Sequence, residues 1–86
     1  MPYHKDKQQA YQAAEQGYVE AIDANDQIVK ESPDYGRQLK HLKQEVNEAL
    51  QQIENALEVA SETQRFRLEQ YRDELSEIVR EVNEME

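Results

Sequence analysis

Apolar residues recur at alternating steps of three and four along most of the chain, and this spacing constrains the fold more than any other feature. One seam consists of Leu39, Leu42, Val46, Ala49 or Leu50, Ile53, Ala56 or Leu57, and Ala60. A second consists of Leu68, Tyr71, Leu75, Ile78, Val82 and Met85. This spacing places side chains on one face of an α-helix, where they pack against another helix at a small crossing angle. The pattern therefore predicts an all-α chain.

The two seams do not join in register. Continuing the first seam beyond Ala60 predicts apolar residues one position earlier than those of the second seam. The slip coincides with Ser61 and Gln64, which are spaced as a capping box: the serine hydroxyl accepts from the Gln64 amide, and the Gln64 side chain reaches back. This favours a helix break near residues 60–63. The alternative is one helix of about fifty residues with a stutter.

A further helix is predicted near the amino terminus. Its apolar stripe consists of Tyr11, Ala14, Tyr18, Ala21, Ile22, Ile28 and Val29. Asp6 is the predicted N-cap, with Gln9 three residues later. Gly17 costs about 1 kcal/mol relative to Ala in a helix interior, so we expect this helix to depend on its neighbours.

The segment Ser32-Pro33-Asp34-Tyr35-Gly36 contains one of the two prolines and one of the two glycines, and it predicts a corner. Ser32 or Asp34 can cap the helix that follows, and Pro33 suits a turn or a first helical position. Gly36 tolerates a bend, while Tyr35 is expected to fold back over the end of the bundle. Each of these roles is structural.

With both breaks, the chain forms a single domain, 1–86, with helices at about 6–31, 36–60 and 62–85. Short connections make consecutive helices antiparallel, which predicts an antiparallel three-helix bundle. If only the Pro-Gly corner is real, the alternative is a long helical hairpin that dimerises into a four-helix bundle.

Composition limits what such a fold can do. Only 37% of the 86 residues are hydrophobic, and the net charge is -9, with 19 acidic residues against 10 Lys and Arg. Acidic residues prevail along the whole chain, which opposes binding to nucleic acid and to anionic membranes. The chain has no cysteine, and it shows no apolar run typical of a signal peptide or a membrane span. We predict a cytoplasmic protein.

The sequence offers little evidence of a metal site or an active site. The Glu-x-x-His pairs of carboxylate-bridged metal sites in helical bundles are absent, because Met1 and Gln38 stand three residues before His4 and His41. His41 and Glu45 could share a metal, but they supply too few ligands for a closed site. The serine and threonine hydroxyls are explained as caps or exposed helix positions. We predict no metal, no cofactor, no catalytic residues and hence no enzyme.

Three arginines near the start of the last helix raise the question of nucleic-acid binding. Arg65, Arg67 and Arg72 surround Phe66 in the sequence. On a helix Arg65 and Arg72 point away from Arg67, and acidic residues intervene. The segment therefore does not predict a nucleic-acid interface.

Partner contact is predicted instead for four residues: Val59, Phe66, Tyr71 and Leu75. Val59 and Phe66 lie off the two seams, so they either close over the turn at 60–63 or form a small exposed patch for a partner. Tyr71 and Leu75 belong to the seam itself. Tyr11 and Tyr18 are seven residues apart and share a helix face, where we expect their rings to pack.

The stretch ALEVASETQRFRLEQYRDELSEIVREVNEM contains an Ala-Ser-x-x-Gln-Arg-x-x-Leu pattern formed by Ala60, Ser61, Gln64, Arg65 and Leu68. With the length of the chain and the break before a long helical pair, this pattern resembles the small YtzC-type proteins of Bacillus and relatives, a family of unknown function. The resemblance covers about two thirds of the chain. It implies a cytosolic protein of a low-GC Gram-positive bacterium and transfers no functional residue.

A weaker resemblance is to the WXG-type secreted helical hairpins, which carry Trp-x-Gly at the bend. Here Tyr35 directly precedes Gly36 and there is no Trp. The Tyr-x-x-x-Asp/Glu tail of those proteins is also missing, because Leu75 stands four residues after Tyr71.

These observations predict a small acidic interaction or regulatory module that binds a protein partner, or a second copy of itself as a homodimer, by helix-face packing. The alternative is an acidic mimic of nucleic acid. In that case Glu69, Asp73, Glu77 and Glu81 would occupy a basic DNA-binding surface.

Overall fold

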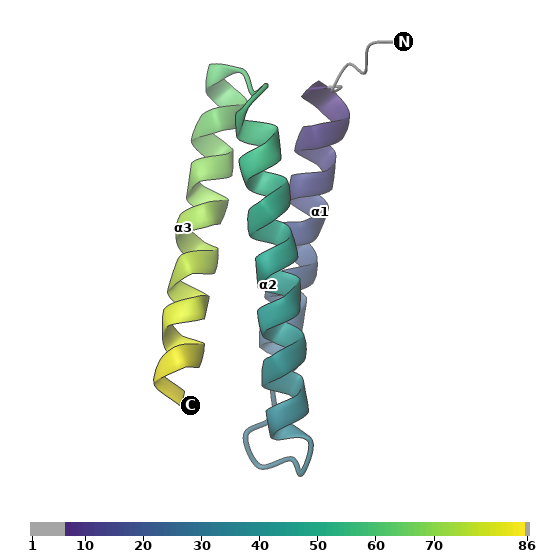
Figure 1. Ribbon diagram of the computed structural model, residues 1–86, viewed down its shortest axis with the longest axis vertical. Coiled ribbons are helices and arrows are strands. Elements are labelled where there is room, and N and C mark those ends of the chain that lie inside the picture. Colours follow the sequence, from purple (N-terminus) through teal and green to yellow (C-terminus); the bar gives the residue numbers. More distant parts are fainter. Residues whose placement is uncertain (1–6, 86) are drawn as a thin grey trace.

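The computed structural model describes residues 7–85, which form three α-helices. α1 spans Lys7–Asp26, α2 spans Tyr35–Leu57 and α3 spans Glu62–Met85. α1 and α3 run in the same direction, and α2 runs antiparallel to both (Figure 1). The prediction of an all-α, antiparallel three-helix bundle is confirmed. The long-hairpin alternative is wrong, because the chain turns between Leu57 and Glu62.

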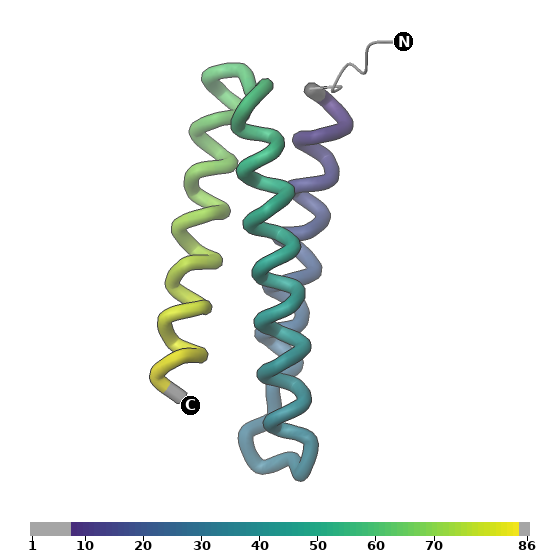
Figure 2. Tube along the Cα trace, viewed as in Figure 1, coloured from purple at the N-terminus to yellow at the C-terminus, as the bar shows by residue number. Residues whose placement is uncertain are grey.

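The bundle is long and thin, with principal extents of 49 × 26 × 16 Å. Its two connections lie at opposite ends of α2 (Figure 2). Among the helices of residues 7–85, none is at once long enough and apolar enough to cross a membrane.

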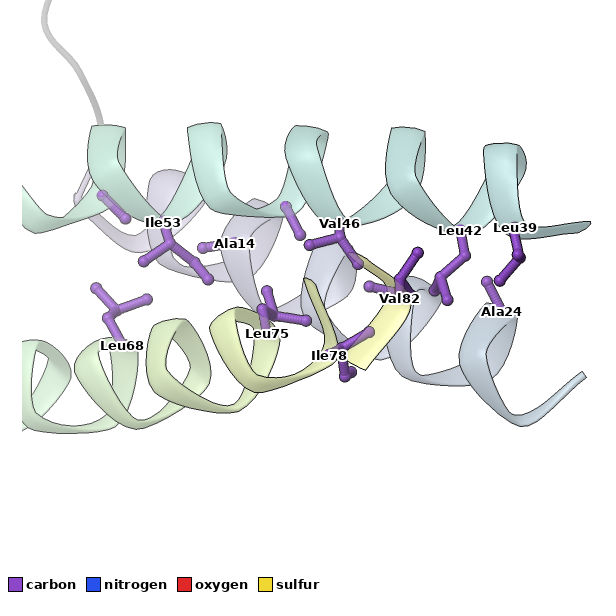
Figure 3. Close-up of a cluster of buried hydrophobic side chains, with 13 residues drawn as sticks. Ala14, Ala24, Leu39, Leu42, Val46, Ile53, Leu68, Leu75, Ile78 and Val82 are labelled. Atoms are coloured by element: carbon purple, nitrogen blue, oxygen red, sulfur yellow. The ribbon is translucent and has the colours of Figure 1, made fainter. Parts of the chain in front are cut away.

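The core lies along the predicted seams. α2 contributes Leu39, Leu42, Val46, Ala49, Ile53 and Ala56, and α3 contributes Leu68, Leu75, Ile78 and Val82. At one end of the core Ile53 faces Leu68, and at the other Leu39 lies next to Ala24 of α1 (Figure 3). Where the sequence left two choices, the structure buries Ala49 and Ala56 and leaves Leu50 and Leu57 half-buried.

α1 presents small residues to the core, and this explains its glycine. Ala14, Gly17, Ala21 and Ala24 are all buried, and α1 makes its most extensive contact with α2. A Cβ atom on Gly17 would lie 3.2 Å from the Ala49 Cα and would overlap the Gln52 side-chain oxygen. Gly17 therefore lowers helix propensity but lets α1 lie close to α2.

The predicted capping box separates α2 from α3. The Gln64 amide donates to the Ser61 hydroxyl at 3.3 Å, and the Ser61 amide donates to the Gln64 side-chain oxygen at 3.2 Å. The Arg65 guanidinium also donates to the Leu57 carbonyl, at 3.4 Å, near the carboxyl end of α2. These bonds satisfy backbone groups that the break would otherwise leave without partners. The predicted break is thus confirmed, although α2 ends at Leu57 and not at residue 60.

α1 ends at Asp26, five residues before the predicted end at 31. The Ile28 amide bonds to the Asn25 carbonyl at 3.3 Å, and the Val29 amide donates to the Gln38 side chain at 2.9 Å. The Gln38 side chain of α2 thus accepts a hydrogen bond from an amide that, in a longer α1, would bond to a carbonyl of that helix. The predicted N-cap, Asp6, lies outside the described residues.

At the corner, Ser32 makes the contacts that organise the turn. Its hydroxyl accepts from the Asp34 amide at 3.1 Å, and its carbonyl accepts from the Tyr35 amide at 3.1 Å. Asp34 occupies the N-cap position of α2 but makes no capping hydrogen bond with its side chain. Tyr35 packs half-buried against the core. Gly36 lies in the first turn of α2 without a positive φ, so it is not the bend that the sequence suggested.

The two glycines should respond in opposite ways to a larger side chain. Gly36→Ala is expected to raise the free energy of unfolding by about 0.5 kcal/mol, because the added methyl meets no atom within 4 Å and favours helix. Gly17→Leu is expected to lower it by about 2 kcal/mol, because the side chain would push α1 away from Ala49. Denaturant unfolding measures both, and a Gly17→Leu protein as stable as the parent would contradict the close approach.

Candidate functional site

Two tyrosines stack between the parallel helices. The rings of Tyr18, on α1, and Tyr71, on α3, have centroids 4.1 Å apart and an angle of 17° between their planes. Tyr18 lies at the edge of the buried stripe formed by Ala14 and Ala21, and Tyr71 follows Leu68 by one turn. α1 and α3 run in the same direction (Figure 1), and the ring contact joins these two helices.

Each tyrosine hydroxyl donates to a carboxylate on the opposite helix. The Tyr18 hydroxyl donates to Glu74 on α3, and the Tyr71 hydroxyl donates to Glu15 on α1 at 3.1 Å. Each helix therefore supplies one ring and one acceptor, three residues apart. This crossed arrangement connects α1 to α3 by two hydrogen bonds and one ring contact.

The environment of the pair keeps both phenols protonated. The hydrogen bond to Glu74, aided by partial burial, raises the pKa of Tyr18 to about 12. Partial burial, followed by the hydrogen bond to Glu15, raises the pKa of Tyr71 to about 12, although a hydrogen bond with Arg67 opposes this. Both hydroxyls thus act as donors across the neutral pH range.

Beside the pair, α1 forms an open groove of about 610 Å³. Its lining consists of Gln12, Glu15, Gln16, Tyr18, Val19, Glu20 and Tyr71. Val19 is 48% exposed. The groove combines aromatic surface with carboxylates and leaves the phenols within reach of small solutes.

Sequence reasoning missed this arrangement. It paired Tyr18 with Tyr11, whereas the structure stacks Tyr18 on Tyr71 and packs Tyr11 half-buried against the core. A signal was present in the order Glu-x-x-Tyr at 15–18 and Tyr-x-x-Glu at 71–74. When two parallel helices lie side by side with these two segments level, such mirrored spacings place each hydroxyl near the carboxylate of the other helix, as in this structure.

The four predicted partner residues occupy different environments. Phe66 is 66% exposed on α3, and Val59 is half-buried in the preceding connection, at the same end of the bundle. Tyr71 is half-buried in the stacked pair, and Leu75 is completely buried in the core. Of the four, Phe66 offers the most surface to another molecule.

The three arginines near Phe66 each interact with a different residue. Arg65 donates to the Leu57 carbonyl, and Arg67 interacts with Tyr71. Arg72 lies 3.7 Å from the Glu54 carboxylate of α2. Their guanidinium groups therefore do not form one basic patch.

The predicted histidine pair is a surface contact. His41 Nε2 lies 3.9 Å from Glu45 Oε1, an ion pair when the imidazole is protonated, and the His41 side chain is 63% exposed. Within residues 7–85, no three His, Cys, Asp or Glu side chains are grouped as metal ligands. His4 lies outside the described residues. His41 lines two hollows, of about 270 and about 250 Å³, both slightly below the usual range of small-molecule sites.

Comparison with protein-family models, with curated proteins and with solved structures finds no match to this chain. The resemblance to YtzC-type proteins therefore stays a prediction.

The tyrosine pair predicts how stability depends on alkaline pH. The folded pKa values of Tyr18 and Tyr71 lie above the ordinary value of 10.0, so the folded chain holds these protons more tightly than the unfolded chain. Their contribution is fully present below pH 10 and is lost as the pH rises towards about 12. Denaturant midpoints measured across this window should therefore fall.

The matched control is the double variant Tyr18→Phe with Tyr71→Phe, which has no phenolic protons to lose at these two positions. The parent protein should lose more stability than this variant between pH 10 and 12. Parallel curves for the two proteins would show that the hydroxyl hydrogen bonds do not favour the protonated phenols.

Proposed function

We propose that this chain is a non-catalytic protein-interaction module that binds its partner through the outward face of α3, with Phe66 as the central contact. The observation that carries the proposal is the 66% exposure of the Phe66 side chain within a regular helix. Large exposed aromatic side chains are common anchors of protein interfaces.

Phe66 is not required by the core. It stands two residues before the buried Leu68, and two helical steps rotate a side chain by about 200°, to the opposite face of the helix. Full burial of a phenylalanine side chain contributes about 1.5 to 3 kcal/mol. The share of this free energy that belongs to the exposed 66% of Phe66 is available to a partner that covers it.

Two acidic residues share the helix face of Phe66 and indicate the chemistry of the partner, although Arg65 and Arg67 stand directly beside Phe66 in the sequence. Glu62 and Asp73 lie on the same face of α3 as Phe66, about one turn before it and two turns after it, and both are exposed. A complementary surface would offer an apolar pocket for the ring, bordered by lysine or arginine. A second copy of this chain also carries net negative charge, so it is less complementary to Glu62 and Asp73 than a basic partner.

Nucleic-acid mimicry is the alternative, and the structure supports it less. The predicted row Glu69, Asp73, Glu77 and Glu81 follows one face of α3, but Arg80 forms an ion pair with Glu77. Glu69 is half-buried. The row therefore carries less exposed negative charge than its spacing alone predicts.

Partner capture from an extract of the source organism tests the proposal. Phe66→Ala is expected to weaken binding of the captured protein by at least tenfold, in line with the loss of a buried aromatic anchor. Thermal unfolding of this variant should stay close to that of the parent, because the side chain is exposed. Val19→Ala is the matched control, since Val19 is an exposed apolar residue on α1.

Salt dependence separates the two functions. Binding through Phe66 should persist at high ionic strength, whereas binding by a row of carboxylates should collapse. Light scattering reveals whether the partner is a second copy of the chain. Equal affinity of the parent and Phe66→Ala for every captured protein would overturn the proposal.

A further inference from the structure

We propose that Tyr18 and Tyr71 are a site of oxidative cross-linking, at which a one-electron oxidant converts the stacked pair into a dityrosine bond between α1 and α3. The inference goes beyond the proposed interaction module and does not depend on it. It rests on the stacking of the rings, on the carboxylate that each phenol contacts, and on the open groove beside them.

The first argument is proximity. Dityrosine forms when the ortho carbons of two phenol rings join, so the rings must meet before either radical reacts elsewhere. Tyr18 and Tyr71 are already in face-to-face contact, with ring centroids 4.1 Å apart. Reactants held in this way react as one molecule and not by chance encounter. Small side-chain rotations, which occur in nanoseconds or less, bring the ortho carbons together.

The second argument concerns the proton. A phenol that loses an electron also loses its hydroxyl proton, and a base within hydrogen-bond distance can accept it in the same step. The Tyr18 hydroxyl donates to Glu74, and the Tyr71 hydroxyl donates to Glu15 at 3.1 Å. Each ring therefore has its own proton acceptor.

The chemistry balances with two equivalents of a one-electron oxidant, such as an oxidised haem peroxidase supplied with hydrogen peroxide. Each equivalent removes one electron from one phenol, and the two hydroxyl protons pass to Glu74 and Glu15. The two phenoxyl radicals then form one carbon–carbon bond. The hydrogen on each joined carbon moves to the phenolic oxygen, which restores both aromatic rings. The product is lighter than the parent by two hydrogen atoms.

Access and selectivity also favour this pair. The groove of about 610 Å³ is lined by both tyrosines and is open, so an oxidant at the protein surface can take electrons from the two rings. Among residues 7–85, the Tyr18–Tyr71 contact is the one stacked aromatic pair. Tyr11 and Tyr35 provide internal comparisons, because both are half-buried tyrosines outside this stack.

The test oxidises dilute protein with a haem peroxidase and hydrogen peroxide, and follows dityrosine fluorescence and intact mass. The expected product has the size of one chain and lacks two hydrogen atoms. Proteolytic mapping should find the peptides that contain Tyr18 and Tyr71 joined. The cross-link should also raise the thermal unfolding midpoint, because it restricts the unfolded chain.

Four variants make the test decisive. Tyr18→Phe and Tyr71→Phe should each abolish the intrachain product, whereas Tyr11→Phe and Tyr35→Phe should leave its yield within about twofold of the parent. Helicity is checked for each variant by circular dichroism. A chain unfolded in native buffer by a buried charge, Leu75→Asp, should lose the product, which controls for a variant that fails to fold.

Three results would overturn the proposal. They are oxidised chains joined only to other chains, an intrachain bond that maps to Tyr11 or Tyr35, and an equal yield of the Tyr18–Tyr71 product from folded and unfolded protein.

Discussion

Two reciprocal hydrogen bonds between Ser61 and Gln64 end one apolar seam and start the next. The bonds are 3.2 and 3.3 Å long, and each pairs a backbone amide with a side-chain oxygen. Without them the amides at the start of α3 would have no partner inside the chain. The break lets α3 turn back along α2, so that its shifted seam packs against the core and not against another molecule. The rest of the arrangement depends on this reversal.

The reversal makes α1 and α3 parallel neighbours and determines which face of α3 meets the core. At the tyrosine pair, rings and carboxylates from the two helices cross, which connects elements that are far apart in the sequence. On the opposite face of α3, Phe66 is left exposed because the core uses Leu68 and Leu75. One face of α3 thus contributes to internal cohesion, while Phe66 stays exposed on another.

Regular seams and local chemistry made much of this fold predictable. The stripes of α2 and α3 are long and regular, so the two helices were predicted. The capping box needs only two residues, Ser61 and Gln64, so the break between the helices was predicted as well. The end of α1 was not, because Ile28 and Val29 continue its apolar pattern while the Gln38 side chain, nine residues beyond Val29, captures the Val29 amide. Local pattern contains no information about that contact.

The tyrosine pair was missed for a related reason. Tyr11 and Tyr18 share a face of one helix, and sequence spacing alone favours pairing them. The contact between Tyr18 and Tyr71 depends on the axial register and rotation of α3 relative to α1, which the predicted order and direction of the helices do not give. Gly17 is a similar case: its effect on helix propensity is visible in the sequence, but the close approach of Ala49 is not.

A distance measurement between α2 and α3 tests the reversal most directly. The chain has no cysteine, so Asn47→Cys and Ser76→Cys can carry spin labels at exposed positions of the two helices. Labelled protein diluted with unlabelled protein reports distances within one chain. The bundle predicts helix axes about 10 Å apart at this level, with a correspondingly short distance between the labels. A continuous helix through Ser61 would place the two residues about 44 Å apart, and that result would contradict the account.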